Sequence, residues 1–244
     1  MNRRMNTETN WEQLAPGVAR RRLPHWDATV GAVSGATGAL VVDTGATLAE
    51  GAGIRQQVRR LFGHPATHVA LTHAHFDHVL GTAAFAGVQV YGATGLDVLL
   101  AGARDETRAS AVRHGMPADE AAEAADLLVS PQHTVHGEHL LDLGGRRVLL
   151  ANIGPGHSGH DLVVLVPPES AGAVPVVFCG DLVEESGEPQ AGPDAVPSRW
   201  PAALDRLLAL GGEDALYVPG HGAVVDARFV RAQREELARR FGVS

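Results

Sequence analysis

The sequence predicts an α/β fold, in which strands and helices alternate along the whole chain. Short apolar runs rich in β-branched residues recur between glycine and proline turns, as expected for strands. Longer runs of Ala, Leu, Glu and Arg separate them, as expected for helices. No linker rich in Pro, Gly and Ser divides the 244 residues, so we expect one domain over residues 1–244.

The N-terminal half is expected to hold four short strands and three helices. The helix that begins at Leu48 is predicted to end at Phe62, because Gly63 and then Pro65 follow it. The strands are expected at residues 28–35, 38–45, 67–73 and 88–92, and the other two helices at 94–114 and 118–128.

The C-terminal half repeats this order of strands followed by helices. A Gly-Gly pair at 144–145 between apolar runs predicts a hairpin, and two continuous apolar runs predict strands that are buried on both faces. Residues 184–198 form a long irregular stretch, which is typical of a functional loop. The two apolar strands are expected at 161–167 and 174–181, a last strand at 215–222, and helices at 201–210 and 226–241.

Composition limits the classes of function. A hydrophobic fraction of 45% with 20% charged residues is typical of a globular protein. The net charge of −8 disfavours nucleic acid, so the expected partner is a small-molecule substrate. One cysteine excludes an intrachain disulfide, and no apolar run is long enough to span a membrane. The N-terminus lacks the apolar run of a secretory signal, so we expect a cytoplasmic protein.

The stretch LTHAHFDHVLG at residues 71–81 is the densest group of titratable side chains. Residues at i and i+2 of an extended segment point the same way, so His73 and His75 can converge on one ion. Asp77 and His78 follow the turn and can face a second point nearby. Imidazole and carboxylate are suitable ligands for zinc, iron or manganese.

Three further groups that can bind metal follow later strands. His157 lies in GPGHSGHD, Asp181 ends VVFCGD, and His221 lies in YVPGHG. Polar groups at several strand ends are the layout of a site built at one edge of a sheet. The sequence therefore predicts a metal site rather than an exposed polar turn.

The ordered motifs THAHFDH, GPGHSGHD, CGD and PGHG, with an early LVVDTG, resemble the metallo-β-lactamase fold superfamily of metallohydrolases. The resemblance spans residues 39–222 and implies a four-layer αβ/βα sandwich built from two similar halves. It implies that Asp181 bridges two ions and that Asp43 supports the site from behind. The implied ligands are His73, His75 and His157 for the first ion, and Asp77, His78 and His221 for the second.

The expected cofactor is two divalent ions, zinc in the first place and iron or manganese as alternatives. They would share a bridging hydroxide, because coordination lowers the pKa of water to roughly 7. Asp77 beside this nucleophile is predicted to be catalytic, by orienting the hydroxide or shuttling a proton. We therefore expect a dinuclear metallohydrolase acting on a small ester, lactone, thioester or amide.

Alternative functions on the same fold remain open. They are a mononuclear iron oxidoreductase similar to a persulfide dioxygenase, a phosphodiesterase, and a non-catalytic binding module. Penicillin hydrolysis is disfavoured, because Glu184 stands where related zinc β-lactamases carry a lysine for the drug's carboxylate.

Four other features carry weaker expectations. Cys179 is expected to be a small buried side chain on the same side of its strand as Asp181. His160 and Asp161 are equally well explained as partners of the ligands or as ordinary loop residues. Residues 133–139, with three histidines, are expected to form an edge strand or a hairpin with exposed side chains.

Overall fold

The computed structural model describes residues 5–6, 11–170 and 172–243. Residues 1–4 and 7–10, on which the expectation about a secretory signal depends, lie outside the described residues. No helix among those described is long and apolar enough to cross a membrane.

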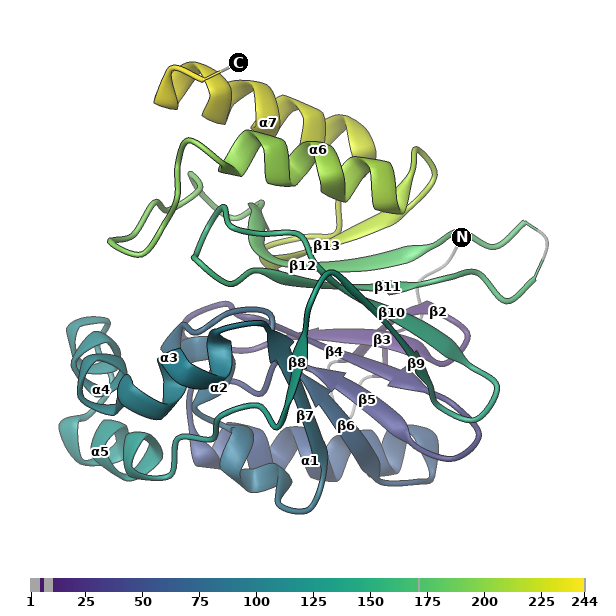
Figure 1. Ribbon diagram of the computed structural model, residues 1–244. Helices are drawn as coiled ribbons and strands as arrows, with labels where there is room; N and C mark the ends of the chain where they lie inside the picture. The colour runs from purple at the N-terminus through teal and green to yellow at the C-terminus, as the bar shows by residue number, and fades with distance from the viewer. Residues whose placement is uncertain (1–4, 7–10, 171, 244) are drawn as a thin grey trace.

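Two sheets lie face to face in the middle of the molecule (Figure 1). The first has its strands in chain order, antiparallel from β1 to β5 and parallel from β5 to β8. Its strands are β1 (Met5–Asn6), β2 (Trp11–Ala15), β3 (Val18–Arg22), β4 (Thr29–Ser34), β5 (Ala39–Val42), β6 (Ala66–Ala70), β7 (Gln89–Ala93) and β8 (His133–Val135).

The second sheet has the order β13-β12-β11-β10-β9, and only the β12–β13 pair is parallel. The Gly-Gly turn at 144–145 joins β9 to β10, so the predicted hairpin is confirmed. The strands of this sheet are β9 (Glu138–Asp142), β10 (Arg147–Asn152), β11 (Leu162–Val166), β12 (Val176–Glu184) and β13 (Leu216–His221).

Helices cover the outer faces of both sheets, which confirms the four-layer αβ/βα sandwich (Figure 1). Helix α1 (Leu48–Phe62) lies under the first sheet, and α6 (Trp200–Gly211) and α7 (Ala227–Phe241) lie over the second. Helix α1 begins where Thr47 accepts a hydrogen bond from the Glu50 amide, and it ends at Gly63 with φ 79°.

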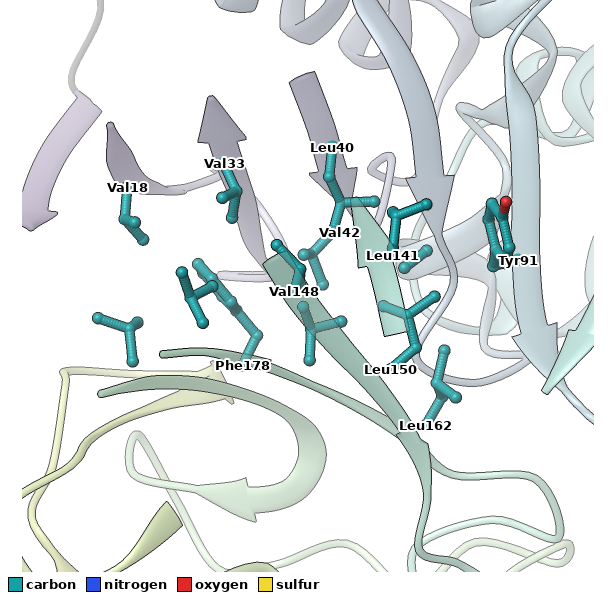
Figure 2. Packing of buried hydrophobic residues seen from close by; sticks show 14 of the residues in the cluster. Val18, Val33, Leu40, Val42, Tyr91, Leu141, Val148, Leu150, Leu162 and Phe178 are labelled. Atoms are coloured by element: carbon teal, nitrogen blue, oxygen red, sulfur yellow. The ribbon is translucent and has the colours of Figure 1, made fainter. Parts of the chain in front are cut away.

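The core between the sheets is built from the apolar alternate positions of strands on both sides. Figure 2 shows Val33 and Val42 of the first sheet facing Val148 and Phe178 of the second. All four side chains are almost fully buried, so this layer holds the two halves together.

The single helix predicted at 94–114 is two helices, α3 (Leu96–Gly102) and α4 (Arg104–Arg113). The prediction of one continuous helix is therefore wrong. Leu96 packs into the core under the first sheet, whereas Ala111 packs against Phe76 in a separate cluster with α5 (Ala118–Asp126). The break after Gly102 lets each half bury its own apolar face.

The histidine-rich stretch 133–139 forms no hairpin, because its two strands belong to different sheets. Strand β8 lies at the edge of the first sheet and β9 at the edge of the second. His136, between the two strands, and His139, in β9, are exposed. The predicted edge strand with exposed histidines is confirmed. Strands β2 and β3 were not expected from the sequence.

Candidate metal centre

All seven predicted ligands lie together at one end of the two sheets. The first sheet supplies four of them, from the loop that follows β6 and from the short helix α2 (Phe76–Val79). The second sheet supplies the others from the β10–β11 loop, from within β12 and from the end of β13. The strand predicted to end at Asp181 continues to Glu184. Their ligand atoms form two groups, each within 4.8 Å, namely His73, His75, His157 and Asp181 in one and Asp77, His78 and His221 in the other.

The first group, His73, His75 and His157 with Asp181, surrounds one point. His157 Nε2 lies 3.0 Å from His75 Nδ1. Asp181 Oδ2 lies 3.5 Å from His73 Nε2 and 3.5 Å from His157 Nε2. Three imidazole nitrogens and a carboxylate oxygen are thus close enough to share one cation.

The second group, Asp77, His78 and His221, lies next to the first. Asp77 Oδ2 is 3.6 Å from His78 Nε2 and 3.4 Å from His221 Nε2. Asp181 reaches this group as well, because its Oδ1 is 3.2 Å from His78 Nε2 and its Oδ2 is 3.3 Å from His221 Nε2. Asp181 therefore lies between the two groups, where the resemblance placed the bridging ligand.

The unpaired atoms of the centre match the needs of cations. Among the described residues, three buried side-chain atoms that face the centre have no hydrogen-bond partner, namely His73 Nε2, His78 Nε2 and Asp181 Oδ1. An unpaired buried polar atom costs roughly 1–3 kcal/mol, so native structures seldom leave several together. Ring nitrogens and a carboxylate are the donor set of zinc sites, and the residues fit such an ion.

The electrostatics of the two groups differ. Burial lowers the pKa of His73 to about 4 and holds the pKa of His157 well below its usual range, so both rings are neutral and can bind a cation. At His221, burial is outweighed by the negative charge of Asp181 and by hydrogen bonds to Asp181 and Asp77, which raise its pKa to about 10. A cation in the second group therefore has to displace a proton from His221.

Asp43 and Thr72 orient two of the histidines from behind. Asp43 Oδ2 accepts a hydrogen bond from His78 Nδ1 at 2.9 Å, and its two oxygens accept from the Thr72 amide and hydroxyl at 2.8 Å each. Thr72 Oγ1 in turn accepts from His73 Nδ1 at 2.9 Å. Both rings thus carry their hydrogen on Nδ1 and turn Nε2 toward the centre.

The supporting position of Asp43 agrees with the resemblance, whereas sequence reasoning missed three other partners. Thr72 directly precedes His73, and this adjacency was the one signal available for it. His75 Nε2 lies 3.0 Å from Asp194 Oδ2, and the Trp26 carbonyl accepts from His221 Nδ1 at 2.9 Å. The expected loop at 184–198 included Asp194, but no pattern linked it to His75.

Asp161 and Ser158 close the loop that carries His157. Asp161 Oδ1 accepts from the Ser158 amide at 3.0 Å and from the Ser158 hydroxyl at 2.7 Å. Burial raises the pKa of Asp161 to about 7. His160 Nδ1 contacts the Thr94 carbonyl at 3.0 Å instead of a ligand. Asp161 therefore shapes the loop through Ser158, and His160 belongs to the loop's outer contacts.

Cys179 is buried, as expected, but it does not share a side with Asp181. Its side chain packs in the apolar cluster between the second sheet and helices α6 and α7. The Asp181 carboxylate instead meets the histidines of the first sheet. Gly180, with φ 54°, interrupts the alternation of side chains between them, and this is why the prediction from strand periodicity is wrong.

Comparison with known proteins agrees with the fold. The sequence matches the family model of the metallo-beta-lactamase superfamily over residues 25–221, and no curated protein matches. Similar solved structures include a metallo-β-lactamase from Hirschia baltica, with a TM-score of 0.65, 18% identity, and 93% of this chain and 96% of that chain covered. The Pseudomonas aeruginosa metallo-β-lactamase FIM-1 in its mono-zinc form gives a TM-score of 0.68, 21% identity, and 96% of both chains covered.

At such low identities the solved structures show the fold alone. The family model covers residues 25–221 and so includes all seven residues of the centre. It also includes Trp26, whose carbonyl accepts a hydrogen bond from His221. The chain therefore belongs to the metallo-beta-lactamase superfamily.

Proposed function

We propose that this protein is a hydrolase that holds two divalent ions and cleaves a small ester, lactone, thioester or amide. Zinc is the proposed metal, with iron and manganese as the alternatives. The observation that carries the proposal is the position of Asp181. One of its oxygens lies 3.3–3.5 Å from ring nitrogens of both groups, as a bridging carboxylate requires. Bound there, the ions would supply an activated water and polarise the scissile carbonyl.

Asp77 is the proposed catalytic residue. Its carboxylate is buried and ionised, because the charge of His78 and a hydrogen bond from His221 outweigh burial and lower its pKa. Such a carboxylate can orient a water molecule beside the second group and accept its proton.

A covalent nucleophile is not part of this proposal. The Ser158 side chain is almost fully buried, and its hydroxyl is held by a hydrogen bond to Asp161 within the same loop. Burial raises the pKa of the Cys179 thiol, and Cys179 packs away from the centre. These contacts support attack by water rather than by a side chain.

The proposed substrate is neutral or positively charged near the scissile bond. Glu184 is buried beside His157, and Asp194 lies half-exposed at the edge of the first group. The charged one at neutral pH is Asp194, because burial and the charge of Asp181 raise the pKa of Glu184 to about 8. The Asp194 carboxylate disfavours a substrate with its own carboxylate next to the reacting carbonyl. Penicillins and cephalosporins have such a carboxylate, and we expect them to be poor substrates.

The test combines metal analysis with a substrate panel. The purified protein should bind two zinc-like ions per chain and hydrolyse at least one lactone, ester, thioester or amide. Asp181→Ala and His78→Ala should lose metal and activity, whereas His139→Ala, an exposed histidine of β9, should keep both. One iron per chain would favour the oxidoreductase reading instead. Two ions bound without hydrolysis of any member would show that the substrate class is wrong.

A further inference from the structure

Four of the five histidines in the centre have a hydrogen-bond acceptor at the ring nitrogen that faces away from it. The acceptors are an oxygen of Thr72 for His73, Asp194 for His75, Asp43 for His78 and the Trp26 carbonyl for His221, at 2.9–3.0 Å. A histidine that binds a cation through one nitrogen carries its hydrogen on the other, so each ring needs such an acceptor.

His157 is the exception among these described residues. Its Nε2 faces His75 and Asp181, whereas its Nδ1 is buried and has no hydrogen-bond partner. The ring cannot turn freely to find one, because it packs edge-on against Trp200 with a centroid distance of 5.3 Å. A buried N–H without an acceptor is unfavourable, and a carboxylate lies just beyond reach of this nitrogen.

That carboxylate belongs to Glu184, the last residue of β12. Glu184 Oε1 lies 3.7 Å from His157 Nδ1, just beyond hydrogen-bond distance. The residue is only 8% exposed, and its backbone amide donates to the Gln233 side chain at 3.1 Å. Its Oε1 also accepts from the Gln190 amide at 3.2 Å. Glu184 is thus anchored both to the sheet and to the loop that follows.

We infer that Glu184 is the positioning residue of His157: its carboxylate accepts the Nδ1 hydrogen when His157 Nε2 binds the first ion. A movement of less than an ångström closes the gap. The same oxygen holds Gln190, so ion binding in the first group also steadies the loop from Glu185 onward. The inference rests on the proposed two-ion site and assigns Glu184 a role that concerns this site rather than the choice of substrate.

The first experiment compares metal affinities, measured by competition with a chromophoric chelator. Glu184→Met keeps the length of the side chain but removes the acceptor, and it should weaken one of the two zinc sites about 10- to 100-fold. Glu184→Gln keeps an acceptor oxygen and should stay within about threefold of wild type. Glu188→Gln, an exposed acid of the same loop, should bind both ions as wild type does.

A double variant assigns the effect to His157. If Glu184 acts through this ring, adding Glu184→Met to His157→Ala should cause no further loss of affinity. A second measurement covers the case in which Glu184→Met does not fold. In the zinc-loaded protein, the low-field proton resonance of His157 Nδ1–H should shift upfield in Glu184→Gln.

Wild-type affinity in Glu184→Met, additive losses in the double variant, or an unmoved resonance in Glu184→Gln would each overturn the inference. If the wild-type protein binds no divalent ion at all, the proposed site fails and the role of Glu184 fails with it. Two ions bound with no effect at Glu184 would overturn the inference alone.

Discussion

Asp43 is the buried carboxylate behind His78. It lies in a buried turn after β5 with φ 60°, a backbone conformation that residues other than glycine seldom adopt. In this position its two oxygens accept three hydrogen bonds, from His78 and twice from Thr72. Through Thr72 it also acts on His73, so one carboxylate supports a ligand in each group.

Replacing Asp43 by Asn should weaken metal binding without removing a ligand. An amide has a single acceptor oxygen, so it cannot replace both Oδ1, which accepts from the Thr72 amide, and Oδ2, which accepts from His78 and the Thr72 hydroxyl. Its NH2 group would face a donor at one of these two positions. We expect a loss of about 10- to 100-fold in metal affinity, measured by chelator competition. Asp119→Asn, which removes the same charge from the exposed start of α5, should leave the affinity unchanged. Equal affinities of Asp43→Asn and wild type would contradict this role.

Asp161 should make the metal-free protein less stable as the pH rises. Its folded pKa of about 7 lies above the usual 3.8, so between these values the unfolded carboxyl is ionised while the folded one keeps its proton. The free energy of unfolding then falls with rising pH, by up to about 1.4 kcal/mol per unit from this group. Its contribution is complete below pH 3.8 and lost by about pH 7.

Asp161→Asn isolates this effect, because the amide oxygen still accepts from Ser158 but does not titrate. In urea denaturation of the metal-free proteins, the variant should gain stability relative to wild type between pH 4 and 7. If the free energies of unfolding of the two proteins change with pH in parallel, Asp161 is ionised in the folded state and this prediction is wrong.

At the scale of elements, β12 carries the centre because it is not a regular strand. Its register with β13 shifts on either side of Gly180. Cys179 before this point packs under the outer helices, and Asp181 after it reaches the ligands of the first sheet. A regular strand would have turned Asp181 to the same side as Cys179.

Gly180→Ala should therefore reduce both stability and metal affinity. A Cβ at this position would lie 2.8 Å from Thr72 Cβ and 2.9 Å from Thr72 Oγ1, in addition to the cost of a positive φ, roughly 1 kcal/mol. Gly63→Ala is the matched control, since Gly63 also has a positive φ, 79°, but open space around it. Urea denaturation should show the larger loss for Gly180→Ala. Equal losses in the two variants would mean that the contact with Thr72 is relieved without strain.

At the scale of the whole molecule, the centre joins the two sheets at one end. His73, His75, Asp77 and His78 come from the first sheet's connections, and His157, Asp181 and His221 from the second. Bound ions would thus crosslink the two halves beside the apolar core shown in Figure 2.

Removing the ions should lower the thermal stability of the whole fold. At free zinc 1,000 times its Kd, one site adds about 4 kcal/mol, which corresponds to a rise of about 10 °C for a chain of this size. Scanning calorimetry with zinc and with excess chelator measures the difference. The double variant His78→Ala/His157→Ala should respond little to either. Coincident transitions of the wild type under both conditions would contradict the crosslink.

The sequence predicted the parts of the molecule that depend on near neighbours and on chain order. Strand patterns, glycine turns and the motif order led to the α/β class and to the seven residues of the centre. The helix break after Gly102 and the separation of β8 from β9 were missed, because both depend on which apolar cluster or sheet receives each segment.

The sequence by itself determined which groups can bind cations, because the type of each side chain and its place in the motifs depend only on the order of residues. The tertiary structure alone decided what orients them. His75 meets Asp194 across 119 positions of the chain, His221 meets the Trp26 carbonyl across 195, and Glu184 approaches His157 from another strand. Such contacts arise from the packing of one sheet on the other, and no local pattern encodes the distance between two segments that only the folded core brings together.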